Sequence, residues 1–234
     1  MFTCLFIDLD DTVLDFHAEE AHALDRALRA HGFAATPAQL ERYNAINKSF
    51  WARMDQGELT REQVLVGRFT VFLAEIGAAL DPAALTAEYE RNLWDAPLLL
   101  PGAKEALARL SRKYRLFLAS NGNAEVQAAR LAGAGLYPYF EQVFISQEVG
   151  FDKPSPEYFA ACFARIPGFR REEGLMVGDS LTSDMAGGRR AGLATCWVNP
   201  QHLPRQAECP VDYEIESLAR LEALLDRIQE GETR

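Results

Sequence analysis

The most informative segment of the sequence is Cys4-Leu5-Phe6-Ile7-Asp8-Leu9-Asp10-Asp11-Thr12-Val13. A short apolar run ends here in three carboxylates within four positions, which predicts a buried strand that opens into an acidic turn. In an extended chain, residues i and i+2 point to the same side, so Asp8 and Asp10 share a face and Asp11 points away. Two carboxylates this close repel each other unless a positive group lies between them. The pair therefore predicts either a site for a divalent cation with oxygen ligands or a solvated acidic turn.

Composition and charge narrow the class of protein. The 234 residues can bury one large core, or one core with a smaller attached domain. A formal net charge of -10 argues against a groove for a nucleic-acid polymer, because such grooves need clustered Lys and Arg. No signal peptide is visible, and no apolar run approaches the roughly 20 residues of a membrane span. The four cysteines show no short paired spacing of the zinc or redox kind. We therefore expect a cytoplasmic protein that binds neither nucleic-acid polymers nor membranes.

Helix signals fill the region that follows the acidic turn. Asp15 is a candidate cap for a first helix, and Thr36-Pro37-Ala38-Gln39 combines an N-cap, a first-turn proline and a capping-box glutamine. Thr60-Arg61-Glu62-Gln63 repeats the capping box, and Asp81-Pro82 starts a fourth helix. Because no convincing strand occurs in this region, the sequence predicts an inserted all-helical cap domain over residues 16–96.

From Pro101 onward, apolar strands alternate with helical segments. The predicted strands of this region are 115–119, 143–146, 175–177, 194–198 and 213–215. Such an alternation with short loops calls for a parallel sheet that is covered by helices on both faces. The sequence therefore predicts an α/β fold, with a doubly wound, Rossmann-like core made of residues 1–15 and 97–234.

Polar residues gather at the carboxyl ends of the predicted strands or in the loops beyond them. They are Asp8 with Asp10, Ser120-Asn121, Lys153 and Asp179. Taken singly, each has a plain explanation, such as a turn for Ser120-Asn121 or a solvated loop position for Lys153. Ligands of open parallel sheets bind at the edge where the carboxyl ends meet, so together these residues predict one site.

Four motifs follow one another along the chain in a recognisable order. They are Asp8-Leu9-Asp10-Asp11-Thr12-Val13-Leu14, Ser120-Asn121-Gly122, Lys153-Pro154-Ser155-Pro156, and Gly178-Asp179-Ser180 with Asp184. In this order the chain resembles the haloacid dehalogenase (HAD) superfamily of hydrolases, with a helical C1-type cap inserted after the first motif. The resemblance covers the whole chain, and it implies that the protein is an enzyme.

Softer patterns resemble one branch of that superfamily, the pyrimidine 5′-nucleotidases. They lie at residues 47–51, 67–69, 146–150 and 192–197. Enzymes of this branch remove phosphate from dUMP, UMP, dTMP and modified analogues. The resemblance therefore implies a small phosphorylated substrate, in particular a nucleotide, and we expect a monomer or a small homo-oligomer.

The resemblance also implies a role for each residue at the sheet edge. Asp8 would be the nucleophile that forms an aspartyl-phosphate. Asp10 would protonate the leaving group and then activate water. Ser120 and Asn121 would bind the phosphoryl group, and Lys153 would neutralise both that group and Asp8.

A Mg²⁺ ion is the implied cofactor. Its ligands would be Asp8, Asp10 through the backbone carbonyl, and Asp179, because Mg²⁺ prefers oxygen ligands. Asp184 would lie beside these ligands and fix their orientation, although a simple acid at a helix start explains it nearly as well.

The predicted cap offers candidates for substrate specificity. Asn47, Lys48 and Trp51 fall within one helical turn, so one face can carry an amide, a charge and an aromatic ring. A pyrimidine could stack on Trp51 or bond to Asn47, and Arg68 could bind a base or a phosphate. The alternatives are Trp51 in the core of the cap, Lys48 in solvent and Arg68 in a surface salt bridge.

The favoured function is a Mg²⁺-dependent phosphatase of the 5′-nucleotidase kind. A 2-haloacid dehalogenase would need neither a metal nor a carboxylate two residues after the nucleophile, so Asp10 and Asp179 speak against it. A sugar-phosphate phosphatase or phosphomutase would use the same residues on another substrate. A regulatory ligand-binding protein on this fold requires the loss of a catalytic group, yet all four motifs are intact.

Overall fold

The computed structural model of the chain describes residues 1–93, 97–205, 207 and 209–231. It divides into two compact units, a core unit of Met1–Asp15 with Leu99–Arg234 and a helical unit of Phe16–Leu98. The first predicted boundary lies between residues 15 and 16 and stays a prediction. The second, between residues 96 and 97, adjoins residues 94–96, which lie outside the described residues. Among the described residues, no helix is both long and apolar enough to cross a membrane.

The core unit is built on a parallel sheet of six strands in the order β3-β2-β1-β4-β5-β6. The strands are β1 (Cys4–Ile7), β2 (Arg115–Ser120), β3 (Gln142–Ile145), β4 (Gly174–Gly178), β5 (Ala194–Val198) and β6 (Tyr213–Ile215). The acidic strand β1 lies in the middle, paired with β2 on one side and β4 on the other. Each predicted strand is present, and the prediction of an α/β parallel-sheet core is confirmed.

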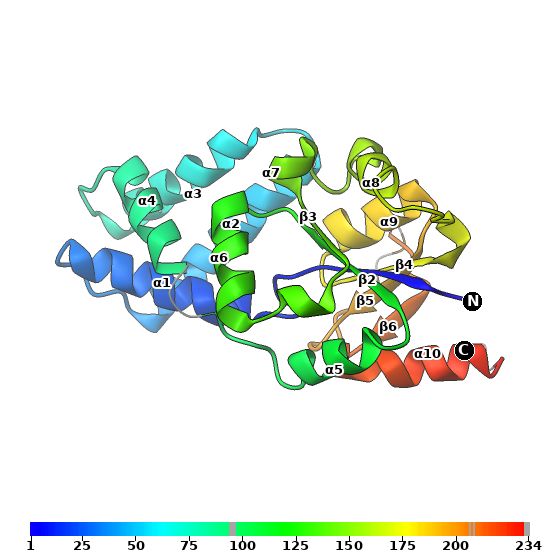
Figure 1. Ribbon diagram of the computed structural model, residues 1–234. Coiled ribbons are helices and arrows are strands. Elements are labelled where there is room, and N and C mark those ends of the chain that lie inside the picture. Colours follow the sequence, from blue (N-terminus) through cyan, green and yellow to red (C-terminus); the bar gives the residue numbers. More distant parts are fainter. Residues whose placement is uncertain (94–96, 206, 208, 232–234) are drawn as a thin grey trace. The chain divides into compact units, whose positions relative to one another are not determined.

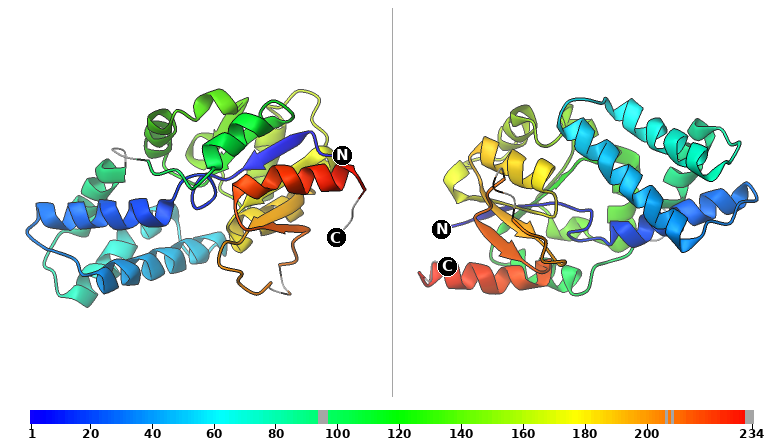
Figure 2. Two further views of the ribbon diagram at one scale, coloured as in Figure 1. Left: turned by 90° about the horizontal axis from the view of Figure 1, so that it is seen from below. Right: turned by 180° about the vertical axis from the view of Figure 1, so that it is seen from behind.

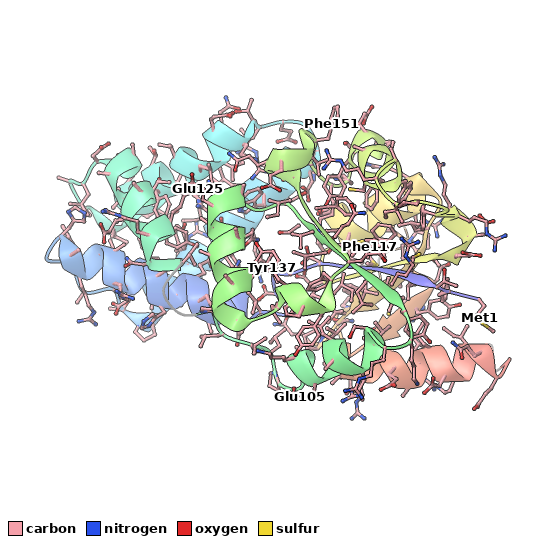
Figure 3. All side chains as sticks on the ribbon, viewed as in Figure 1. Met1, Glu105, Phe117, Glu125, Tyr137 and Phe151 are labelled. Atoms are coloured by element: carbon pink, nitrogen blue, oxygen red, sulfur yellow. The ribbon has the colours of Figure 1, made fainter. Side chains whose placement is uncertain are left out.

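Helices cover both faces of this sheet. They are α5 (Ala103–Leu110), α6 (Ala124–Ala134), α7 (Ser146–Val149), α8 (Pro156–Phe163), α9 (Ala186–Ala191) and α10 (Leu221–Gln229). Leu5 and Ile7 of β1 pack into a core with α5 and α10, which lie side by side (Figures 1 and 2). Phe6 points to the opposite face, where it stacks on Phe117 of β2 (labelled in Figure 3) and packs in one cluster with residues of α8 and α9. Alternate residues of one strand thus serve two cores, as a doubly wound sheet requires.

Short helical segments complete the core unit. They are η1 (Tyr137–Tyr139), η2 (Arg171–Glu173), η3 (Leu181–Met185) and η4 (Leu218–Arg220). A π-helical turn, η3, follows β4 and leads into α9. Ser180 caps this turn, because its hydroxyl accepts the N–H of Ser183 at 3.1 Å. Single π turns are frequent at functional sites, and this one contains Asp184.

The described residues of the helical unit form helices α1 (Phe16–Ala30), α2 (Pro37–Asp55), α3 (Arg61–Ile76) and α4 (Pro82–Leu93), blue to teal in Figure 1. Both predicted capping boxes are formed, at Thr36 for α2 and at Thr60 for α3. The helices enclose a core of aromatic rings that contact one another edge to face or tilted. These rings belong to Tyr43, Phe69, Phe72 and Tyr89. The prediction of an all-helical insertion is confirmed.

Candidate active site

A buried ammonium group joins two carboxylates at the carboxyl end of β1. Asp8 follows this strand directly, and its N–H donates to the carbonyl of Val177 on β4 at 2.9 Å. Lys153 Nζ donates to Asp8 Oδ1, to Asp184 Oδ1 and to the carbonyl of Ala119, each at 2.6 Å. Asp8 is 6% exposed and Lys153 is 1% exposed. Asp8, Lys153 and Asp184, which belong to three different sequence motifs, therefore meet in one buried cluster.

Burial and neighbouring charges together shift the pKa values of these groups. It raises the pKa of Asp8 to about 8, against the opposing effect of the Lys153 charge. For Lys153, burial acts to lower the pKa, but the carboxylates of Asp184 and Asp8 outweigh it and the pKa is raised. Burial and the charge of Asp8 also raise the pKa of Asp179 well above its usual value. One ammonium cannot neutralise so many carboxylates, so bound protons or a further cation must balance the site.

Asp8, Asp179 and Asp184 form an acidic cluster. Carboxylate oxygens of the three, one from each, all lie within 4.8 Å of one another. Such hard oxygen donors fit Mg²⁺. Asp179 follows β4, and its carbonyl accepts the indole N–H of Trp197 at 2.8 Å. The sequence predicts Asp184 only as an ordering residue beside the metal, whereas the structure brings its carboxylate into the cluster.

Asp184 reaches the cluster because it folds back over the end of β4. Its Oδ2 accepts the N–H of Ser180 at 3.1 Å, while Oδ1 binds Lys153. Gly178 makes room for this arrangement, since a Cβ at that position would collide with the Asp184 carboxylate. The glycine of the Gly178-Asp179-Ser180 motif is thus explained by close packing.

The side chain of Asp10 has different partners from that of Asp8. Gln127 Nε2 donates to Asp10 Oδ2 at 2.8 Å, and Arg130 Nη1 donates to Asp10 Oδ1 at 2.6 Å. Both partners lie on α6, and the Arg130 side chain is 1% exposed against 30% for Asp10. The next residue, Asp11, adopts a left-handed backbone with φ 53° and donates its N–H to the carbonyl of Leu14, as expected of a turn residue.

Ser120 and Asn121 have separate roles in the structure. Ser120 is 1% exposed, and its Oγ accepts hydrogen bonds from Gln127 Nε2 at 2.8 Å and from the N–H of Gly122 at 3.3 Å. Asn121 instead binds the backbone of Lys153, and its Nδ2 also lies 3.3 Å from the Ser183 hydroxyl. The Asn121 side chain therefore fixes the loop that carries the lysine.

Asn47 and Arg68 of the helical unit are buried in its interior. They are 2% and 3% exposed, and Arg68 Nη1 donates to Asn47 Oδ1 at 2.6 Å. Asn47 Nδ2 donates in turn to Glu20 Oε1 at 2.5 Å, and the Arg68 guanidinium lies over the rings of Phe69 and Tyr89. The alternative that places Arg68 in a surface salt bridge is wrong, because its side chain is enclosed among rings.

Lys48 and Trp51 reach solvent on the same helix. Lys48 is exposed, and Trp51 is half-buried with the guanidinium of Arg61 5.6 Å from its ring centroid. The expectation that Asn47 and Lys48 share one face is wrong. Adjacent residues of an α-helix project about 100° apart, and here the first points inward and the second outward.

A family model described as haloacid dehalogenase-like hydrolase matches residues 2–192 of the chain. The chain belongs to this family. Three relatives match it over nearly its whole length.

Two of these relatives of the HAD-like hydrolase are pyrimidine 5′-nucleotidases. PynA of Streptococcus pneumoniae is 37% identical over 224 residues, which cover 95% of this chain and 94% of PynA. YjjG of Escherichia coli is 31% identical over 221 residues, which cover 94% of this chain and 96% of YjjG. The crystal structure of the HAD-hydrolase YfnB from Bacillus subtilis, bound to magnesium, matches with a TM-score of 0.92 at 39% identity, over 96% of this chain and 99% of that one. The predictions of a HAD-type fold and of a phosphoric monoester hydrolase are confirmed at the level of family and reaction class.

The sequence analysis of this HAD-like hydrolase missed Gln127 and Arg130. A signal for them is present, since Gln127, Arg130, Leu131 and Ala134 follow the i, i+3, i+4, i+7 spacing of a buried helix stripe. Two polar residues in such a stripe must find polar partners. Their partners, Asp10 and Ser120, are distant along the chain, so the sequence does not reveal them.

Proposed function

We propose that this HAD-like hydrolase is a Mg²⁺-dependent phosphatase that uses Asp8 as its nucleophile and acts on pyrimidine nucleoside monophosphates such as dUMP, UMP and dTMP. The observation that carries the proposal is the bond from buried Lys153 Nζ to Asp8 Oδ1 at 2.6 Å, inside a cluster of carboxylates. A carboxylate attacks phosphorus only when it is ionised. The Lys153 ammonium favours that form and opposes the burial that raises the pKa of Asp8 to about 8.

The phosphoryl group would be held by Ser120 and Lys153. Because Ser120 Oγ already accepts two hydrogen bonds, its own hydrogen is available to donate to a phosphoryl oxygen. Lys153 adds a charge that is preorganised by its three bonds, so it needs no rearrangement when charge develops on the phosphoryl group.

The reaction would proceed in two displacements. An oxygen of Asp8 attacks phosphorus and forms an aspartyl-phosphate, while the leaving alkoxide takes a proton from Asp10. Asp10 then removes a proton from water, the water oxygen attacks the same phosphorus, and phosphate leaves with Asp8 restored. Mg²⁺, held by Asp8 and Asp179 with the backbone carbonyl of Asp10 and with Asp184 beside them, would neutralise phosphoryl oxygens as a Lewis acid.

The preference for pyrimidine nucleotides is supported by the names of PynA and YjjG, which this chain matches over more than nine-tenths of its length. In the helical unit, Lys48 and Trp51 keep a proposed role as contacts to the base, because their side chains reach solvent. Asn47 and Arg68 would act on specificity by fixing α2 against α3. The cytoplasmic location and the monomeric or small homo-oligomeric state stay predictions from the sequence.

A phosphate-release screen tests the proposal. The panel contains pyrimidine and purine nucleoside monophosphates and sugar phosphates, each with and without Mg²⁺, and a 2-chloro acid with halide release as the readout. We expect phosphate release that needs Mg²⁺ and is fastest with UMP or dUMP. Equal rates over the whole panel would contradict the pyrimidine preference, isomer formation would indicate a mutase, and metal-independent halide release would indicate a dehalogenase. A lack of any turnover would favour the regulatory alternative.

A further inference from the structure

A closed set of hydrogen bonds links Asp10, Ser120 and two residues of α6. Gln127 Nε2 donates to Asp10 Oδ2 and to Ser120 Oγ, both at 2.8 Å. Arg130 Nη1 donates to Asp10 Oδ1 and to Gln127 Oε1, both at 2.6 Å. Gln127 and Arg130 are 2% and 1% exposed, so the donors of these bonds are shielded from solvent.

We propose that Gln127 and Arg130 are positioning residues, which hold the Asp10 carboxylate and the Ser120 hydroxyl in fixed register for phosphoryl transfer. This inference rests on the proposed function, because it assigns Asp10 to proton transfer and Ser120 to phosphoryl binding. The Asp10 carboxylate is 30% exposed and lies just before the turn at residues 11–13, so without partners it could adopt several rotamers in water. Donors on both of its oxygens remove that freedom, and proton transfer needs a donor at hydrogen-bond distance in a defined direction.

The bonds also orient Ser120. Its oxygen accepts from Gln127 and from the N–H of Gly122, so its hydrogen must point to a third direction. Gly122 is needed for this geometry, because a Cβ there would collide with the Gln127 side chain. The Gln127 amide therefore orients both the Asp10 carboxylate, which would transfer a proton, and the Ser120 hydroxyl, which would bind phosphate.

The local sequence places α6 at the right position to supply these donors. Asn123 caps the helix, since its Oδ1 accepts the N–H groups of Glu125 and Val126 at 3.0 and 3.3 Å. The helix therefore begins four residues after Ser120, at the end where Glu125 is labelled in Figure 3. Residues 127 and 130 are one turn apart on the buried side of α6.

Stability does not explain why these two positions are polar. A buried arginine carries a large desolvation cost, and apolar residues of similar volume are often as stable or more stable. Here Arg130 occupies a position in a buried helix stripe whose next members, Leu131 and Ala134, are apolar. The placement of the Asp10 carboxylate explains why a buried arginine is present despite its desolvation cost.

The test compares two leaving groups. The leaving group of UMP is the uridine 5′-alkoxide, which needs a proton, whereas that of p-nitrophenyl phosphate is a stable phenolate that does not. We measure kcat/KM, which reports the steps through phosphoryl transfer, for the wild type and for Arg130→Met, Arg130→Lys and Gln127→Leu. Arg130→Met is expected to lower kcat/KM for UMP about 10- to 100-fold and to lower that for p-nitrophenyl phosphate far less. Arg130→Lys keeps a donor of the same charge and is expected to recover part of the loss.

Leu131→Ala is the matched control, because Leu131 is buried on the same helix and has no bond to Asp10. It should lower the melting temperature while leaving the ratio of the two kcat/KM values unchanged. Equal losses on both substrates, or no loss on UMP, would overturn the inference. If Arg130→Met does not fold, the same comparison on Gln127→Leu decides. A wild type that hydrolyses neither ester would instead show that the proposed function has failed.

Discussion

Asn121 binds the backbone of Lys153 through both ends of its side-chain amide. Nδ2 donates to the Lys153 carbonyl at 2.7 Å, and Oδ1 accepts the Lys153 N–H at 2.8 Å. These paired bonds tie the end of β2 to the loop that carries the lysine. Because the Lys153 backbone is fixed, its Nζ is held within hydrogen-bond distance of Asp8 and Asp184.

Replacing Asn121 should loosen this loop. Asn121→Ala removes both bonds and leaves backbone groups of Lys153 without these partners, so we expect a loss of about 1–3 kcal/mol in the free energy of unfolding. Phosphate release should fall as well, because the ammonium is no longer held in place. Urea unfolding and UMP turnover check both effects. Unchanged stability and turnover would show that the paired bonds do not hold the lysine.

Lys153→Met should be severely destabilising, and Mg²⁺ should reduce the loss. The variant leaves buried carboxylates without their ammonium, which typically costs about 3–5 kcal/mol. A cation bound between the carboxylates would offset part of that cost. Urea unfolding with and without Mg²⁺ measures the difference.

Arg42→Met serves as the control for this charge removal. Arg42 forms an exposed pair with Glu75, with contacts of 2.7 and 2.8 Å, and we expect its loss to leave stability nearly unchanged. A Lys153 variant as stable as the Arg42 variant in metal-free buffer would contradict the assigned charge balance.

The affinity for Mg²⁺ should rise with pH up to about pH 8. Burial raises the pKa of Asp8 to about 8, so a proton competes with the metal below that pH. In metal-free enzyme the folded state keeps this proton at pH values where the unfolded chain, with a pKa of 3.8, has lost it. Stability therefore falls as pH rises from 3.8 toward 8, and saturating Mg²⁺ should flatten this slope.

Titration calorimetry in buffers of different ionisation enthalpy measures the proton release directly. We expect protons to be released on Mg²⁺ binding near neutral pH and fewer above about pH 8. An affinity that is independent of pH, with no proton release, would show that Asp8 is not a ligand that exchanges a proton for the metal.

Adjacent residues of α2 should differ sharply in their effect on stability. Asn47 is buried between Glu20 and Arg68, so Asn47→Ala leaves a buried carboxylate and a guanidinium short of one partner each. We expect a loss of about 1–3 kcal/mol in the free energy of unfolding. Lys48→Ala is the matched control, because an exposed side chain of the same helix should change stability little. Equal losses in the two variants would contradict the buried network.

The position of three candidate site residues at one edge of the sheet could be predicted from the sequence for a physical reason. Asp8, Ser120 and Asp179 end or directly follow apolar strands, and parallel strands bring their carboxyl ends to one edge whatever lies between them. Local signals such as the capping boxes at Thr36 and Thr60 likewise depend on four neighbouring residues only, and both are formed.

Other features depend on contacts between distant parts of the chain. Gln127 and Arg130 meet Asp10 across more than a hundred residues, so no local pattern connects them. Asp184 enters the acidic cluster because a π turn, which helix periodicity does not anticipate, folds it back over Gly178. The sequence predicts one face for Asn47 and Lys48 because both lie in one helical turn. Their burial depends instead on the direction in which each side chain leaves the helix axis.

The proposed attack of Asp8 on phosphorus leaves a covalent intermediate that can be trapped. Mass spectrometry of enzyme quenched in acid during UMP turnover detects it, with Asp8→Asn as the matched control. We predict one phosphoryl group on the peptide that contains Asp8, none on that peptide in the variant, and loss of phosphate release in a variant that remains folded. A variant that releases phosphate as fast as the wild type, or a phosphoryl group on another residue, would contradict the account.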